Sequence, residues 1–115
     1  MSLKYGSIIL VPFPFTDLTN KKTRPALLLS NPNGVDLILA FITSVNYEPI
    51  EPMHYSLSRS LPFFDQTGLK VNSIIKCDKL ASLSKSIIIG RLGDLPEYIM
   101  KTEINKRLKM ALNIE

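Results

Sequence analysis

Residues 26–43 read ALLLSNPNGVDLILAFIT, and this stretch decides the fold class that the sequence predicts. Two apolar runs, Ala26–Ser30 and Val35–Thr43, lie on either side of the turn signal NPNG at residues 31–34. Asn tolerates the left-handed backbone region and Gly enters it without a steric cost, so NPNG favours a tight reversal of the chain. The stretch is therefore predicted to form a β-hairpin.

Other short strands are expected around this hairpin. Ser7–Val11 is an apolar run that ends at a proline, and His54–Leu57 has an alternating pattern. Val71–Cys77 and Leu83–Ile89 are expected to be two further strands. The stretches between these runs are rich in proline and polar residues and indicate loops, so the first two-thirds of the chain is predicted to be β.

The last twenty residues change to a helical period. Apolar residues recur there at steps of three and four, which is typical of an amphipathic helix; they are Met100, Ile104, Leu108, Ala111 and Leu112. The preceding DLPE at residues 94–97 resembles a capping box with proline in the first turn. A C-terminal helix is predicted from about Leu95 to Asn113, which makes the chain mainly β with one helix.

Composition narrows the class of protein. The chain has 115 residues, of which 45% are hydrophobic and 21% are charged, so we expect one folded domain over residues 1–115 rather than a disordered segment. The net charge of +4 arises in residues 58–115, which hold ten basic and six acidic side chains. A basic excess of this size is compatible with a polyanionic partner.

The counts of cysteine and histidine exclude further classes of protein. Cys77 and His54 each occur once, so the chain cannot build a Cys/His zinc site, and a lone cysteine fits a reducing compartment. The sequence shows no secretory signal and no stretch of about 20 apolar residues, the length that a membrane span needs. We therefore expect a cytoplasmic protein with no metal, no cofactor and no membrane contact.

Two spots at strand ends carry residues suited to phosphate chemistry. Arg24 stands directly before Pro25, which favours an extended backbone, and a guanidinium fixed there can bind two phosphate oxygens. The alternative is that Lys21, Lys22 and Arg24 belong to a solvated basic loop. Thr43 and Ser44 close a long apolar run, where their hydroxyls either bond a phosphate or cap the strand end.

A third spot is KCD at residues 76–78. Strand alternation would place Lys76 and Asp78 on one face and Cys77 on the other, pointing inward. The pair is either a surface ion pair or an acid and a base. His54 stands alone in a strand-like segment, where a packed or surface histidine is more typical than a catalytic one.

Taken together, these segments resemble the PemK/Kid/MazF family. YGSIILVPFPFTDL at residues 5–18 with RPALLLS at 24–30 resembles its N-terminal signature, and ITS at 42–44 its second motif. TGLK at residues 67–70 and SIIKCDKLASLSK at 73–85 are similar to the third. The resemblance covers roughly residues 4–112.

The resemblance implies an SH3-like barrel of five to seven strands with a C-terminal helix, acting as a homodimer. It implies a toxin of a type II toxin–antitoxin system, bound by a cognate antitoxin through an acidic segment and, with it, DNA. The implied activity is that of an mRNA interferase. Such an enzyme is a metal-independent endoribonuclease that cuts single-stranded RNA at short sequences by attack of the 2′-hydroxyl, which leaves a 2′,3′-cyclic phosphate and a 5′-hydroxyl.

The resemblance also implies roles for individual residues. The motif arginine falls on Arg24 and the motif threonine on Thr43, with Asp78 as a candidate base. The arginine that precedes the motif cysteine in the Kid branch is Lys76 here, a candidate acid. The remaining candidates for RNA binding are Phe15, Lys21, Lys22 and Ser44, with Phe13 as a second base platform.

Two alternatives stay open on the same fold. One is a non-catalytic toxin that binds a protein, like the gyrase poison CcdB, although that family ends in a tryptophan-bearing tail and this chain has no Trp. The other is a degenerate interferase that binds RNA or antitoxin without cutting.

Overall fold

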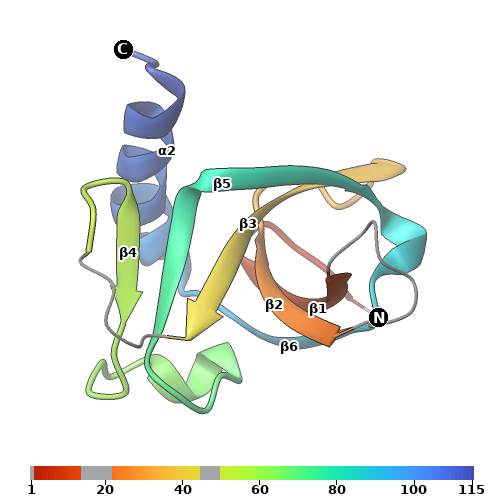
Figure 1. The fold of residues 1–115 in the computed structure, drawn as a ribbon, viewed down its shortest axis with the longest axis horizontal. Helices are drawn as coiled ribbons and strands as arrows, with labels where there is room; N and C mark the ends of the chain where they lie inside the picture. The colour runs from red at the N-terminus through yellow and green to blue at the C-terminus, as the bar shows by residue number, and fades with distance from the viewer. Residues whose placement is uncertain (1, 14–21, 45–49) are drawn as a thin grey trace.

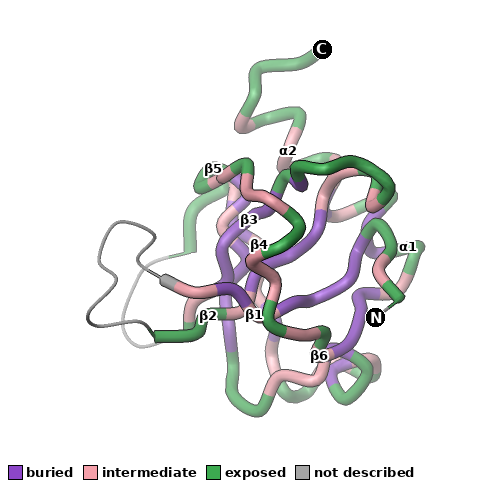
Figure 2. The backbone as a smooth tube through the Cα atoms, turned by 90° about the vertical axis from the view of Figure 1, so that its right-hand side faces the viewer, coloured by how far each residue is buried: buried purple, intermediate pink, exposed green. Residues whose placement is uncertain are grey.

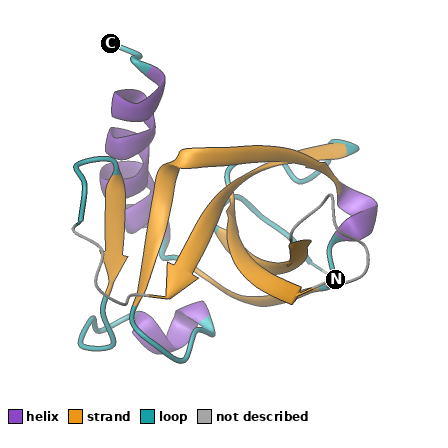
Figure 3. Ribbon diagram, viewed as in Figure 1, coloured by secondary structure: helices purple, strands orange, loops and turns teal. Residues whose placement is uncertain are grey.

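The structure is a computed structural model that describes residues 2–13, 22–44 and 50–115. Within them, six strands form one antiparallel sheet in the order β4-β5-β3-β2-β1-β6. The sheet curls into a half-barrel with a helix at the C-terminal end (Figures 1 and 3), which confirms the predicted fold class. The strands are β1 Ser7–Phe13, β2 Lys22–Leu28, β3 Asp36–Ser44, β4 His54–Leu57, β5 Ser73–Ser84 and β6 Gly90–Asp94.

The predicted hairpin is confirmed as β2 and β3, which pair through Ala26↔Phe41 and Leu28↔Leu39. The first strand was expected to end at Val11, and that boundary is wrong because β1 continues through Pro12 to Phe13. Its pairing with β6 covers residues 7–10, so Pro12 lies past the last residue of β1 that pairs with β6. On this unpaired side of β1, the missing N–H of Pro12 removes no hydrogen bond from the sheet.

The strand predicted at Val71–Cys77 is confirmed over residues 73–77, but it is not separate from the one predicted at Leu83–Ile89, because β5 is one strand of 12 residues that ends at Ser84. Its register against β3 jumps from Ala40↔Leu80 to Phe41↔Lys76, so residues 77–79 form a bulge. The strand bends sharply in its course past β3 (Figure 1), as bulged strands do. After β5 comes a 3₁₀ turn, η2 (Lys85–Ile87), and then β6, which the sequence analysis did not predict.

Two apolar cores lie on opposite faces of the sheet. Alternate residues of the strands point to opposite sides, so neighbouring β1 residues Ile8 and Ile9 are fully buried in different cores. Buried residues run through the strands in Figure 2. One core is made by strand residues Ile9, Val11, Ala26, Leu28, Leu37 and Leu39. The other joins the sheet to the C-terminal helix.

The C-terminal helix is one continuous helical segment with three parts. They are α1 Glu97–Ile99, a π-helical turn η3 Met100–Ile104, and α2 Asn105–Leu112. Met100 and Ile104 are buried against the sheet, whereas Leu112 is exposed where α2 extends beyond β4 and β5 (Figure 1). Arg107 fastens α2 to β4, since its Nε donates to the His54 carbonyl at 2.9 Å.

The predicted helix is confirmed in place, but the predicted capping box is wrong. Pro96 is the N-cap residue and no side chain bonds the helix start. The Asp94 carboxylate instead accepts hydrogen bonds from Arg91 at 2.8 Å, which leaves it unavailable as a cap. Within the described residues, no helix has the length and apolar character to cross a membrane.

Candidate active site

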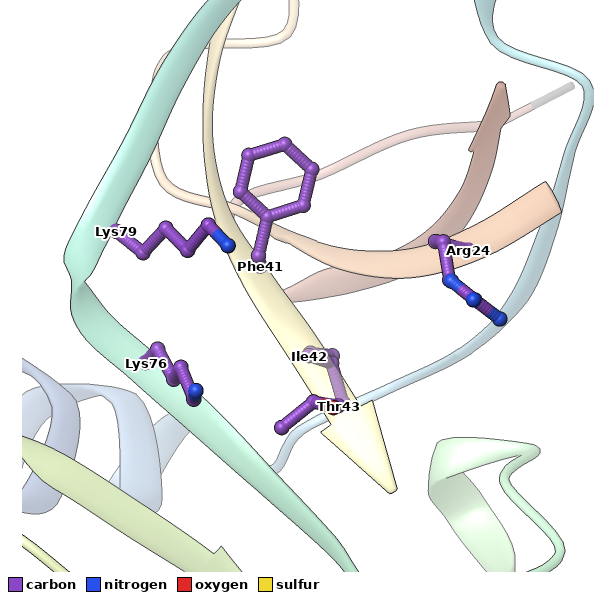
Figure 4. Close-up of a pocket in the computed structure, with 6 residues that line it drawn as sticks. All are labelled: Arg24, Phe41, Ile42, Thr43, Lys76 and Lys79. Carbon is purple, nitrogen blue, oxygen red and sulfur yellow. The ribbon is translucent and has the colours of Figure 1, made fainter. Parts of the chain in front are cut away.

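The edge where β2 and β3 diverge opens a small cavity against β5. The ladder between β2 and β3 ends at Ala26↔Phe41, and the same register continued would place Arg24 opposite Thr43. Across β3, the bulged strand β5 places Lys76 opposite Phe41. The cavity has a volume of about 100 Å³ and is lined by Arg24, Phe41, Ile42, Thr43, Lys76 and Lys79 (Figure 4).

A second cavity adjoins the first, because Arg24, Ile42 and Thr43 line both. It has a volume of about 260 Å³, and its other walls are Pro25, Ser44, Leu69, Val71 and Ser73. Its lining mixes apolar side chains with hydroxyls, whereas the first cavity is cationic. Arg24 and Thr43 therefore stand where a charged cavity meets a larger one with a mixed lining.

The first cavity is strongly positive. Arg24, Lys76 and Lys79 reach it from two strands that flank β3, with Arg24 on one side and both lysines on the other (Figure 4). The Lys79 ammonium lies 5.9 Å from the centroid of the Phe41 ring, within the range of a cation–π contact. Cationic side chains that converge in a cleft concentrate the field and attract anions.

Asp78 lies in a different environment from these cations. Its carboxylate is 2.8 Å from Nε2 of His54, which is buried on β4. The expectation that Lys76 and Asp78 share a face assumed unbroken alternation. The bulge interrupts that alternation, so Lys79 and not Asp78 joins Lys76 in lining the cavity.

His54 and Asp78 also belong to the one group of possible metal ligands found among the described residues. Glu51, His54 and Asp78 place ligand atoms within 4.8 Å of one another. Within this group, Nε2 of His54 and Oδ1 of Asp78 already share a hydrogen bond of 2.8 Å. This group is separate from the residues that line the cationic cavity.

Comparison with known families decides the identity of the chain. Residues 4–112 match the family model described as the PemK-like, MazF-like toxin of type II toxin–antitoxin systems. The chain belongs to this toxin family. The match spans the six strands of the described residues and the whole C-terminal helix, as the sequence motifs predict.

Solved structures share the fold of this toxin-family chain at low sequence identity. A mycobacterial endoribonuclease in complex with its cognate antitoxin has a TM-score of 0.74 at 18% identity and covers 99% of this chain and 98% of that one. MazE-MazF (Form-II) from Deinococcus radiodurans has 0.74 at 20%, covering 100% and 99%. Mycobacterium tuberculosis toxin MazF-mt6 has 0.73 at 16%, covering 95% and 98%. No curated protein matches the sequence.

The structure places most of the predicted site residues of this toxin-family chain. Arg24, Thr43 and Lys76 line the cationic cavity, and Ser44 lines its neighbour. Lys22 begins β2 as an exposed residue outside both linings. Phe15 and Lys21 lie outside the described residues, as does the side chain of Phe13. Phe41 and Lys79 were missed by the sequence analysis, because Lys79 reaches the cavity through the bulge.

Cys77 points into the core, as predicted, and is fully buried. Burial is the main cause that raises the pKa of its thiol from 9.0 to about 11; the charge of Asp78 raises it further, and Arg107 opposes both. The folded state thus holds the thiol protonated. Its contribution to stability is present below pH 9 and is lost as the pH rises toward 11.

We therefore expect Cys77 to react slowly with a thiol reagent. A rise of the pKa from 9.0 to about 11 reduces the thiolate fraction at neutral pH about a hundredfold. Ellman's reagent should modify the native protein at least that much more slowly than the protein unfolded in guanidinium. Equal rates in the two states would contradict the placement of Cys77 in the core.

Proposed function

We propose that this toxin-family chain is an endoribonuclease that cleaves single-stranded RNA without a metal ion, by attack of the RNA 2′-hydroxyl on the adjacent phosphorus. The observation that carries this proposal is the convergence of Arg24, Thr43 and Lys76 from three strands on one cavity. Solved relatives of the same fold are named endoribonucleases, which supports the same activity here.

The proposed reaction forms a bond between the 2′-oxygen and phosphorus and breaks the bond from phosphorus to the 5′-oxygen. It needs an acceptor for the 2′ proton, a donor for the 5′-oxygen, and positive charge at the non-bridging oxygens. Arg24 supplies two parallel N–H donors to those oxygens. The Thr43 hydroxyl donates to one of them, the Lys76 ammonium gives a proton to the departing 5′-oxygen, and a solvent water accepts the 2′ proton.

The larger neighbouring cavity is suited to hold an RNA base during the proposed reaction. Unpaired RNA bases are held by apolar side chains and by hydrogen bonds to their edges. Leu69 and Val71 offer apolar walls beside Arg24, and Ser44 offers a hydroxyl. We propose that the nucleotide next to the scissile bond places its base there.

The proton acceptor is tested by Asp78→Asn. Asn retains an oxygen that can accept from His54, so the variant keeps the fold while it removes the basic carboxylate. Because Asp78 does not line the cavity, we expect cleavage within about two- to threefold of wild type, the scale of a ±0.5 kcal/mol surface change. A loss of about a hundredfold or more in single-turnover rate would instead establish Asp78 as the general base.

We also propose that the chain acts in the cytoplasm as a homodimer that a cognate antitoxin inhibits, and that the complex with the antitoxin binds DNA. Relatives of this fold are solved as complexes with antitoxin. The ten basic residues within 58–115 suit an acidic antitoxin segment. Such contacts weaken with salt, so the affinity of the complex should fall as ionic strength rises.

The experiment that tests the proposed function is incubation of the purified protein with a mixed-sequence single-stranded RNA in EDTA. Cleavage at defined sequences is the expected result. Intact RNA with tight binding would favour a degenerate module, and intact RNA without binding would favour a toxin that acts on a protein target.

A further inference from the structure

We propose that Lys79, held over the Phe41 ring, forms a second phosphate subsite that binds the RNA phosphate adjacent to the scissile one. This inference rests on the proposed function and extends it from one phosphate to two. Lys79 reaches the cavity from the bulge of β5, and neither the motifs nor the proposed chemistry assigns it a role.

The bulge explains why two lysines of one strand reach the same cavity. Lys76 and Lys79 are three residues apart, so strict alternation would send their side chains to opposite faces of β5. The register jump between Ala40↔Leu80 and Phe41↔Lys76 adds residues 77–79 to one strand without partners on the other. Lys79 is thereby turned to the same side as Lys76, and both side chains line the cavity with Phe41 (Figure 4).

Contact with Phe41 restricts the positions open to the Lys79 ammonium. The nitrogen lies 5.9 Å from the ring centroid, and Phe41 is only 9% exposed, so the ring is a rigid part of the sheet. A flexible lysine loses rotamer entropy when it is immobilised. A side chain that already rests on a ring has lost part of that freedom before RNA binds, which favours tighter binding.

The spacing along β3 suits two consecutive phosphates. Thr43 lies nearer the end of β3 than Phe41 does, and Lys79 lies beside Phe41 (Figure 4); all three side chains line the cavity. Thr43 and Phe41 are two residues apart on one strand, a separation of about 6.8 Å. Successive phosphates of an extended single strand are separated on the same scale, so the phosphate beside the scissile one falls near Lys79.

The first test measures how salt affects binding of a mixed-sequence single-stranded RNA. Each phosphate contact contributes about 0.7 to the slope of log affinity against log salt for single strands. Lys79→Ala should weaken binding several-fold and reduce the slope by about that amount, and Lys79→Arg should restore both. Lys101→Ala is the matched control, since it removes the same charge from an exposed helix position paired with Glu97. Equal slopes for Lys79→Ala, Lys101→Ala and wild type would overturn the subsite.

The second test identifies the phosphate. An RNA that spans a mapped cleavage site carries a 2′-deoxy nucleotide at that site, and a neutral methylphosphonate replaces one neighbouring phosphate at a time. At one of the two positions the methylphosphonate should weaken binding to wild type but not to Lys79→Ala. If the binding losses from the methylphosphonate and from Lys79→Ala add at both positions, the inference is overturned even if the wild type cleaves RNA.

Failure of the proposed function has a different signature. A wild type that binds RNA without cutting it, yet loses one salt-dependent contact in Lys79→Ala, would refute cleavage and retain the subsite. A wild type with no affinity for RNA would refute both.

Discussion

Arg24→Ala is expected to cleave RNA about a hundred- to a thousandfold more slowly than wild type, because removal of a donor to a transition-state oxygen costs about 3–4 kcal/mol. Arg24 is exposed at the point where β2 leaves β3, so its removal opens no cavity in either core. The loss should therefore appear in the single-turnover rate and not in the melting temperature. Growth inhibition by the expressed protein should disappear with it.

Three companion variants make the Arg24 result specific. Arg24→Lys keeps the charge but loses the planar pair of donors, and its rate should lie between those of Arg24→Ala and wild type. Arg91→Ala removes an arginine that pairs with Asp94 on the edge strand β6, and its rate should match wild type. Thr43→Ala should lose less than Arg24→Ala, since a neutral donor is weaker than a charged one. An Arg24→Ala protein as fast as Arg91→Ala would place the reaction elsewhere.

Gly93→Ala is expected to destabilise the fold strongly. A Cβ at residue 93 would lie 2.2 Å from the Gln66 carbonyl oxygen and 2.6 Å from the carbonyl carbon of Thr67. These are backbone atoms of η1 (Phe64–Thr67), which cannot yield as a side-chain tip can. Overpacking of this kind costs about 3 kcal/mol, or a fall of roughly 10 °C or more in melting temperature.

Gly90 offers a matched control in the same strand. A Cβ at residue 90 would have no atom within 4 Å, so Gly90→Ala should leave stability unchanged or raise it by up to about 1 kcal/mol. Thermal unfolding monitored by circular dichroism compares the two variants directly. Equal melting temperatures would contradict the close packing of η1 against β6.

The hairpin and the helix could be predicted because local signals determine them. NPNG specifies the reversal between Ala26–Ser30 and Val35–Thr43, and the apolar period of residues 100–112 specifies an amphipathic helix. The boundaries depend on tertiary contacts that such signals do not carry. Pro12 remains in β1 because the pairing with β6 ends before it, and Asp94 fails as a cap because Arg91 engages it.

The candidate site also contains residues that the sequence could predict and residues that it could not. Arg24 and Thr43 are recognisable because each stands near a strand end within a motif, and both line the cavity where the β2–β3 ladder has ended. Lys79 takes the place beside Lys76 that was expected for Asp78, because of a three-residue bulge. Alternation cannot reveal a bulge, since the extra residues depend on how β5 pairs with β3.

The measurement that tests the central claim most directly is an analysis of the RNA ends made by the wild type in EDTA. A mapped substrate should yield a 2′,3′-cyclic phosphate and a 5′-hydroxyl, and one 2′-deoxy nucleotide at the cleavage site should abolish cutting there. A 5′-phosphate product, or continued cutting of the 2′-deoxy substrate at that site, would contradict attack by the 2′-hydroxyl and with it the roles assigned to Arg24, Thr43 and Lys76.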